Sequence, residues 1–211
     1  MAKLIYYYGT MASSKTANAL ITRFQHIQVY EEVWLIKPEI DTRDDIFKDG
    51  KRKAVIKSRI GIEAEAEILR AHESFKDFYN RMLAGDHETP HIIIVDEAQF
   101  LSEEQVEELK EFATYMSTPV YCYGLRTDFT SHLFPGSKRL FELADEIIEI
   151  PSVCECGEPA IINGKFYKGR LVTSGDQIDI GGDEKYRPLC YNHWRYYMLK
   201  AGGKIDEEDD E

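Results

Sequence analysis

Long apolar runs are absent from this sequence, and its first residues do not form a signal-peptide pattern. A membrane helix needs about 20 apolar residues, so we expect no membrane span. Basic residues are also scarce, with 26 Lys and Arg against 38 Asp and Glu and a net charge of −12. That balance argues against binding nucleic acid or an anionic membrane through the general electrostatic field. We therefore expect a cytoplasmic protein with no membrane and no nucleic-acid partner.

Cysteine is another scarce residue, with 4 in a chain of 211, and the sequence shows no internal repeat. In a reducing compartment these cysteines do not indicate disulfides. What the chain does contain is enough apolar material for a full core, because hydrophobic residues make up 43% of it. This content excludes wholesale disorder, and the length suits one domain with a small appendage.

Strand and helix patterns alternate through the first 150 residues. Short apolar runs predict buried strands at residues 4–8, 33–36, 91–95 and 119–123, and a fifth strand at 147–150. Apolar residues at helical spacing predict helices at residues 16–26, 62–83 with a break near 72–74, 102–116 and 137–143. The charged segment 38–59 has few core candidates and is predicted to be a mobile loop that could act as a lid. The alternation is typical of an α/β fold with a parallel sheet flanked by helices.

The turn after the first strand resembles a phosphate-binding P-loop, G-x-x-x-x-G-K-[ST], except that Ser14 stands at the second glycine. In such a loop the backbone N–H groups cradle phosphate oxygens, and the helix N-terminus adds positive potential. An ordinary strand–turn–helix is the alternative, and the Cβ of Ser14 raises a steric question where the backbone approaches the phosphates. The predicted phosphate-binding residues of the loop are Gly9, Thr10, Met11, Ala12, Ser13, Ser14, Lys15 and Thr16.

Two carboxylates, Asp96 and Glu97, follow the apolar strand near residue 95. An Asp at the end of such a strand can hold Mg²⁺ opposite the Lys and Thr of a P-loop. A Glu beside it can take a proton from an attacking hydroxyl group or water. Acidic residues often begin loops, so this motif gains its meaning from the P-loop pattern that precedes it.

Three cysteines and a histidine form two pairs in the last third of the chain, Cys154-x-Cys156 and Cys190-x-x-His193. The pattern is that of a structural Cys₃His zinc site, although the first pair is one residue tighter than the usual C-x-x-C. Cys122 lies in a predicted core strand and is interpreted as a buried thiol.

The amino-acid composition changes at Pro151, after which glycines become frequent. About fifty residues can hardly hold themselves together by core burial alone, and a structural zinc would provide the missing stability. We predict a nucleotide-binding α/β domain at 1–150, a zinc-stapled, loop-rich β subdomain at 151–200, and a solvated acidic tail at 201–211.

Aromatic residues lie on the loop after the fourth predicted strand, namely Phe129 and Phe134. Loops at the carboxyl edge of a parallel sheet are where ligands bind. The two rings could pack in the core beneath the loop, or could join Phe100 and Met11 around a flat ring of a ligand.

Taken together, these motifs resemble the thymidine kinase family of bacteria, their phages and the animal cytosol. The resemblance spans nearly the whole chain apart from the acidic tail. It rests on residues 9–16, 96–100, 124–129, the Cys/His quartet and 181–186, and residues 37–43 and 58–61 resemble the bacterial and phage branch. It implies a P-loop NTPase-like sheet and transfer of the γ-phosphoryl group of ATP to the 5′-hydroxyl of thymidine, with Mg²⁺.

The resemblance also implies roles around the phosphates. Glu97 would be the general base, and Lys15 would bind the β- and γ-phosphates. Magnesium would lie near Thr16, Asp96 and Asp41. Arg43 and Gln99 would complete the contacts to ATP and the moving phosphoryl group.

For the nucleoside, the resemblance implies a pocket closed by a lasso at residues 164–181. The implied nucleoside-binding residues are Met11, Phe100, Leu125, Phe129, Phe134, Asn163 and Tyr186. A homotetramer, feedback inhibition by thymidine triphosphate and a location in the cytoplasm, or in the host cytoplasm for a phage protein, are further implications.

Two positions depart from the family pattern. The family usually has Gly at position 14 and often has Thr near position 163, where this chain has Ser and Asn. Ser14 leaves open an alternative in which the chain binds nucleotide but has lost catalysis. A P-loop motor ATPase is disfavoured by the short, acidic chain, and a zinc-ribbon nucleic-acid binder is disfavoured because basic residues do not cluster around the cysteines.

Overall fold

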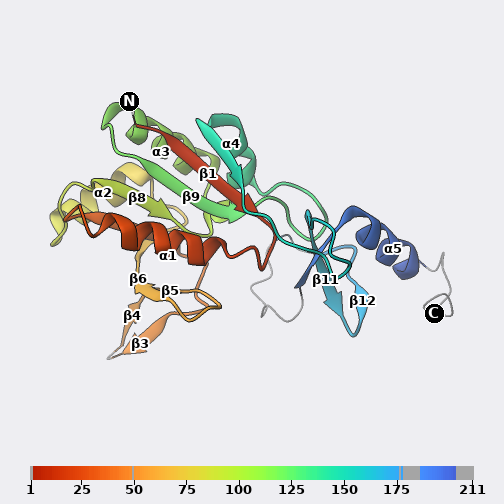
Figure 1. The fold of residues 1–211 in the computed structure, drawn as a ribbon. Helices are drawn as coiled ribbons and strands as arrows, with labels where there is room; N and C mark the ends of the chain where they lie inside the picture. Colours follow the sequence, from red (N-terminus) through yellow and green to blue (C-terminus); the bar gives the residue numbers. More distant parts are fainter. Residues whose placement is uncertain (1, 49, 176, 178–185, 203–211) are drawn as a thin grey trace.

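Figure 1 shows a computed structural model of the chain, which describes residues 2–48, 50–175, 177 and 186–202. The larger part is a sheet flanked by helices, and a smaller part extends from the carboxyl edge of that sheet. Within the described residues, no helix is both long enough and apolar enough to cross a lipid bilayer. The predicted acidic tail lies outside the described residues from position 203 onward.

The central sheet is six-stranded, in the order β10-β1-β9-β8-β2-β7, and every neighbouring pair is parallel. Its strands are β1 (Leu4–Gly9), β2 (Val33–Pro38), β7 (Glu67–Leu69), β8 (Ile92–Val95), β9 (Val120–Leu125) and β10 (Glu146–Glu149). All four residues of β8 are buried, as expected for a strand covered on both faces. The predicted parallel α/β architecture is confirmed.

Helices cover both faces of the sheet (Figure 1). On one face, α1 (Lys15–His26) packs Ala19 and Leu20 against Ile92 and Ile94 of β8. The other face carries α2 (Phe75–Ala84), α3 (Glu103–Tyr115) and α4 (Pro135–Leu143). A short 3₁₀ turn, η1 (Ala98–Phe100), links β8 to α3. The alternation of side chains along the strands therefore supplies two separate cores.

A capping box marks the start of α3. The hydroxyl of Ser102 accepts from the backbone N–H of Gln105, and the side chain of Gln105 accepts from the backbone N–H of Ser102, both at 3.1 Å. The two bonds satisfy N–H groups that have no partner inside the helix.

The prediction of one broken helix over residues 62–83 is wrong in its first half. Residues Glu63–Glu65 form β6, and β7 pairs with β2 as the sixth strand of the sheet. Glutamate and alanine favour helices by propensity, but Ala64 and Ala66 pack against the α1 side of the core with period two. Only α2 is helical, and it begins after its cap residue Ser74.

The prediction that residues 38–59 form an irregular loop is also wrong. The segment contains β3 (Ile46–Lys48), β4 (Lys51–Lys53) and β5 (Val55–Lys57), with β3 paired to β4 and β5 paired to β6. We call β3 to β6 the arm; it lies beside α1 in Figure 1. The ammonium of Lys37 is fully buried and pairs with Asp45 at 2.8 Å, and the guanidinium of Arg52 also pairs with Asp45. Charged residues therefore supply part of the interior that anchors the arm.

The smaller part is an antiparallel sheet in the order β12-β11-β13, followed by α5 (Tyr191–Ala201). Its strands are β11 (Ile162–Tyr167), β12 (Arg170–Leu171) and β13 (Tyr186–Leu189). Its core includes Phe166, Leu171 and Leu189, together with Cys154 and Cys190. The predicted small β subdomain is confirmed, whereas most of the predicted lasso beyond Gly175 lies outside the described residues.

Candidate active site

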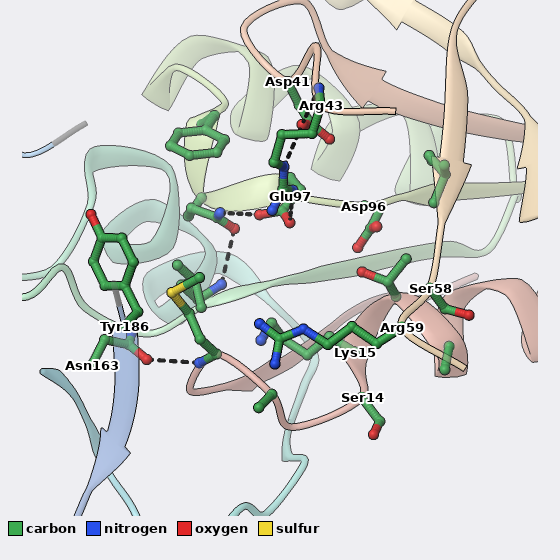
Figure 2. Close-up of a pocket in the computed structure, with 18 of the residues that line it drawn as sticks. Ser14, Lys15, Asp41, Arg43, Ser58, Arg59, Asp96, Glu97, Asn163 and Tyr186 are labelled. Atoms are coloured by element: carbon green, nitrogen blue, oxygen red, sulfur yellow. Dashed lines mark hydrogen bonds and ion pairs between the residues drawn. The ribbon is translucent and has the colours of Figure 1, made fainter. Parts of the chain in front are cut away.

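A cavity of about 450 Å³ opens at the carboxyl ends of β1, β8 and β9, and the arm and the C-terminal subdomain contribute to its walls (Figure 2). Sixteen of the predicted site residues line it: Met11, Ala12, Ser14, Lys15, Thr16, Asp41, Arg43, Asp96, Glu97, Gln99, Phe100, Leu125, Phe129, Phe134, Asn163 and Tyr186. Gly9, Thr10 and Ser13 belong to the same loop but do not line the cavity. The structure therefore brings together residues that are far apart in the sequence.

The loop at residues 9–16 leads from β1 into the first turn of α1. A Cβ on Gly9 would lie 2.5 Å from the carbonyl oxygen of Ile150, so only glycine fits there. Ser14 adopts the left-handed conformation, with φ 64°. Its side chain points away from Lys15 and Asp96 in Figure 2. Serine therefore costs about 1 kcal/mol of backbone strain in this loop, while its hydroxyl is directed away from those two side chains.

Lys15 is buried and folds back onto its own loop. Its ammonium donates to the carbonyl oxygen of Thr10 at 2.6 Å and to the hydroxyl of Ser13 at 3.2 Å. Burial lowers the pKa of Lys15 to about 8, and the negative charges of Glu97 and Asp96 oppose that shift. A cation that is held this way, at a helix N-terminus, suits an anionic ligand.

Asp96 is buried at the end of β8, facing the first turn of α1. Burial, followed by the charge of Glu97, raises the pKa of Asp96 to about 7, and a hydrogen bond from Thr16 opposes the shift. The raised pKa means that the charge of this carboxylate is incompletely compensated by its protein neighbours. Carboxylate and hydroxyl oxygens are the ligands that Mg²⁺ prefers, so Asp96 and Thr16 fit a magnesium site.

Glu97 sits in the left-handed conformation, with φ 52°, which aims its carboxylate into the cavity. The guanidinium of Arg43 and the side-chain amide of Gln99 both donate to it. Arg43 also donates to Asp41 at 2.8 Å, and the charge of Glu97 raises the pKa of Arg43. The amide oxygen of Gln99 accepts from the backbone N–H of Leu125 at 2.9 Å. Glu97 is thus oriented from two sides.

An aromatic pocket forms one end of the cavity, made of Met11, Phe100, Leu125, Phe129 and Phe134. The rings of Phe100 and Phe134 meet edge to face with centroids 5.7 Å apart. Both Phe129 and Phe134 are buried, and the ammonium of Lys165 lies 4.8 Å from the centroid of the Phe129 ring. These rings combine core packing with a face toward the cavity, so the two alternatives for them are not exclusive.

Asn163 joins the two parts of the molecule. Its side-chain oxygen accepts from the backbone N–H of Met11 at 2.7 Å, and its side-chain nitrogen donates to the carbonyl oxygen of Thr127 at 2.9 Å. The residue is buried, and both ends of its amide already have protein partners. Asn163 therefore links β11 to the phosphate loop and to the loop after β9 (Figure 2).

The four predicted metal ligands, Cys154, Cys156, Cys190 and His193, converge in the C-terminal subdomain, with all ligand atoms within 4.8 Å of one another. The Sγ of Cys154 lies 3.2 Å from the Nδ1 of His193, and the Sγ atoms of Cys156 and Cys190 are 3.8 Å apart. Three thiols and one imidazole suit a four-coordinate structural zinc site. Cys122 is a free buried thiol in β9, as predicted.

Several cavity residues carried no predicted role. Asp128 and Thr127 follow β9, and Gln177 donates to the carboxylate of Asp128 at 2.9 Å. Ser58 and Arg59 reach the cavity from the arm. Residues 58–61 belong to the resemblance with the bacterial and phage branch, but that signal gave them no function.

Comparison with known proteins shows which family the chain resembles. The family model described as "Thymidine kinase" matches residues 2–194. The thymidine kinase of Enterobacteria phage T4 is 40% identical over 96% of this chain and 100% of its own length. That of Zymomonas mobilis subsp. mobilis is 41% identical over 92% of this chain and 96% of its own length. Among solved structures, the large terminase of a thermophilic bacteriophage covers 70% of this chain and 40% of its own, with TM-score 0.40 and 10% identity, too low for an inference.

Proposed function

Because the chain belongs to the thymidine kinase family, we propose that it transfers the γ-phosphoryl group of ATP to the 5′-hydroxyl of thymidine. The product, thymidine monophosphate, would serve deoxynucleotide salvage and DNA synthesis. The observation that carries the proposal is one cavity that joins a phosphate loop, two acidic residues and an aromatic pocket. Phosphoryl transfer needs positioning and charge neutralisation, which such a cavity supplies.

Thymidine occupies the aromatic pocket in this proposal. The flat ring of thymine fits against Phe100, Phe129 and Phe134, whose faces and edges offer stacking contacts. Tyr186 at the start of β13 lines the same cavity and closes it from the C-terminal subdomain. The 5′-hydroxyl group then points toward Glu97.

ATP binds with its phosphates on the loop at residues 9–16. Lys15 exchanges the carbonyl oxygen of Thr10 for the β- and γ-phosphate oxygens, a favourable trade because a charged acceptor replaces a neutral one. The backbone N–H groups at the start of α1 add positive potential.

Magnesium would be held by Thr16 and Asp96, with Asp41 lining the same cavity. When bound, it neutralises charge on the phosphates and so favours their attack by a hydroxyl group. Asp41 is engaged with Arg43 and lies 3.6 Å from the ammonium of Lys37, which keeps its pKa below the usual range despite burial.

Glu97 acts as the general base. It accepts the proton of the 5′-hydroxyl group as that oxygen bonds to the γ-phosphorus and the bond between phosphorus and the β-phosphate oxygen breaks, releasing ADP. Arg43 and Gln99 hold the carboxylate in place, and Arg43 would share its positive charge with the moving phosphoryl group.

Three further features complete the proposal. The Cys₃His group holds one structural zinc ion, and the enzyme works in the cytoplasm under feedback inhibition by thymidine triphosphate. The chain assembles as a homotetramer, which would cover large apolar side chains exposed on and after α1, namely Ile21, Phe24, Val29 and Tyr30.

The alternative is a nucleotide-binding homologue that has lost catalysis because of Ser14. Ser14 favours it through the strain of its left-handed backbone. Against it, Lys15, Thr16, Asp96 and Glu97 all line the cavity. A decayed site would be expected to lose some of them.

Incubation of the protein with γ-labelled ATP, Mg²⁺ and a panel of nucleosides tests the proposal directly. We expect label in thymidine monophosphate and little in the purine nucleosides, and added thymidine triphosphate should reduce the rate. Binding of ATP and thymidine without any labelled product would support the impaired homologue instead.

A further inference from the structure

The turn between β5 and β6 has a fixed shape and reaches the cavity. The hydroxyl of Ser58 donates to the carbonyl oxygen of Ile62 at 3.0 Å and accepts from the N–H of Ile62 at 3.1 Å. The backbone N–H of Ser58 donates to the same carbonyl oxygen at 2.8 Å, and Gly61 takes the left-handed φ of +87° that closes the turn. Ser58 is buried, so these bonds are shielded from water.

The arm that carries this turn is anchored on the helix that begins at the phosphate loop. Ile56 is buried against Ala19 and Leu20 of α1, and the buried ammonium of Lys37 donates to the carbonyl oxygen of Val55 at 2.9 Å. The residues just before the turn are therefore held against α1 by apolar packing and tied to β2 by a buried hydrogen bond.

Arg59 is the second residue of this turn, and it lines the cavity. Figure 2 shows its side chain reaching over the phosphate loop beside Lys15. Arg43 lies beside Glu97 and lines the same cavity. Two guanidinium groups from different elements thus approach the space between the loop and the carboxylates.

The charges of these side chains indicate which kind of ligand the arrangement would bind. Arg59 and Lys15 both line the cavity, so two like charges approach one another over the loop. A triphosphate between them would convert the repulsion into two favourable contacts, because guanidinium groups bind phosphate oxygens in a bidentate manner.

We propose that Arg59 is a phosphate-binding catalytic residue, which contacts the β- and γ-phosphates of ATP from the arm, across the cavity from Arg43. The inference rests on the proposed kinase function and adds a residue to it. Arg59 forms and breaks no covalent bond. Its N–H groups hold the phosphate oxygens while the γ-phosphoryl group leaves the β-phosphate oxygen for the 5′-oxygen, whose proton goes to Glu97.

Three variants test this role. Arg59→Ala removes the guanidinium, Arg59→Lys keeps the charge without the planar fork, and Lys53→Ala is the matched control. Lys53 is on the same arm, pairs with Glu65 at the surface and does not line the cavity, so its loss changes the charge of the arm equally.

We expect Arg59→Ala to lower kcat/KM for ATP about 100-fold. Lys53→Ala should stay within about twofold of the wild type, and Arg59→Lys should recover part of the loss. Calorimetry with Mg²⁺ and a non-hydrolysable ATP analogue should show weaker binding to Arg59→Ala, while its thymidine affinity and Tm remain those of the wild type. Unchanged ATP kinetics and analogue binding in Arg59→Ala would overturn the inference, and so would an equal loss of thymidine affinity and Tm, which indicates a structural role.

The binding measurements also separate this inference from the proposed function. If the wild-type protein phosphorylates no nucleoside, the kinase proposal fails. Weaker binding of the ATP analogue to Arg59→Ala would still show that Arg59 contacts phosphate, and unchanged binding would still refute it.

Discussion

The parallel sheet and the C-terminal subdomain both form walls of the cavity, but they are stabilised in different ways. The sheet buries apolar side chains on both faces, so its core would persist without any ligand. The subdomain has a small core on one side of a short sheet, and two members of that core, Cys154 and Cys190, are also candidate metal ligands. The proposed phosphate site would therefore lie on a part that is stable by itself, whereas the proposed nucleoside side of the cavity would depend on a metal.

Loss of the metal should produce the largest effect and separate the two parts. A structural zinc contributes about 10 kcal/mol of binding free energy, which the subdomain cannot replace from its own core. We expect about one zinc per chain, and we expect Cys156→Ala to lose both the zinc and thymidine binding while ATP-analogue binding persists. Metal analysis, with Cys122→Ala as the control that keeps its zinc, checks the first point. An ordered subdomain in zinc-free protein would remove the proposed role of the metal.

A substitution on the sheet side should leave binding intact and stop the reaction. Glu97→Gln keeps the shape of the side chain but removes the group that accepts the proton. We expect kcat to fall about 1,000-fold, which is roughly 4 kcal/mol, with both KM values within about threefold of the wild type. Steady-state kinetics with Glu88→Gln, at an exposed position outside the cavity, provide the comparison. Near-normal turnover would mean that another group takes the proton.

Breaking the link between the two parts should have an intermediate effect. Asn163→Ala leaves the backbone N–H of Met11 and the carbonyl oxygen of Thr127 without their present partner, at a cost of about 2 kcal/mol. We expect a lower Tm and a higher KM for both ATP and thymidine, because the link touches the phosphate loop as well as the nucleoside side. Asn163→Asp keeps the acceptor for Met11 but buries a carboxylate against the carbonyl oxygen of Thr127, so it should lose at least as much. A change confined to the KM of thymidine would instead favour a direct contact with the base.

The smallest effect is expected at the phosphate loop itself. Ser14→Gly relieves about 1 kcal/mol of left-handed strain but adds freedom to the unfolded chain, so the two terms nearly cancel in stability. We expect kcat to stay equal or to rise a few-fold. Ala12→Gly, at another loop residue with φ 64°, is the matched control. A collapse of activity in Ser14→Gly alone would show that the loop depends on serine.

The sequence predicted some regions better than others, because different interactions stabilise them. Continuous apolar runs revealed β1, β2, β8 and β9, because strands in the interior of a parallel sheet carry that signature. The edge strand β10 was also predicted from its apolar run, although most of its residues are exposed. The edge strand β7 was missed because it is short and preceded by glutamate and alanine, and only its pairing with β2 makes it a strand. The arm was missed for a different reason, because its anchor is a buried cluster of Lys37, Asp45 and Arg52 that a hydrophobic pattern cannot reveal.

The residues of the candidate site also divide into those that the sequence pattern predicts and those that it does not. The phosphate loop and the Asp96-Glu97 pair were predictable because each follows a strand whose carboxyl end faces one edge of the sheet. The Cys/His group was predictable from spacing, and its ligand atoms do converge. The double hydrogen bond of Asn163 and the approach of Arg59 depend on how the arm and the subdomain dock, and spacing along the chain carries no information on that.

The buried anchor of the arm has a consequence for ionic strength. Salt screens charges that face water, but it hardly weakens ion pairs from which water is excluded. The pair between Lys37 and Asp45 has no exposed side-chain surface, so concentrated salt should leave the arm attached to β2. Arg59 is exposed at the tip of the same arm, and its attraction for phosphate should weaken in that solution. The arm thus combines a buried ion pair that salt should hardly weaken with an exposed arginine whose proposed phosphate contact salt should weaken.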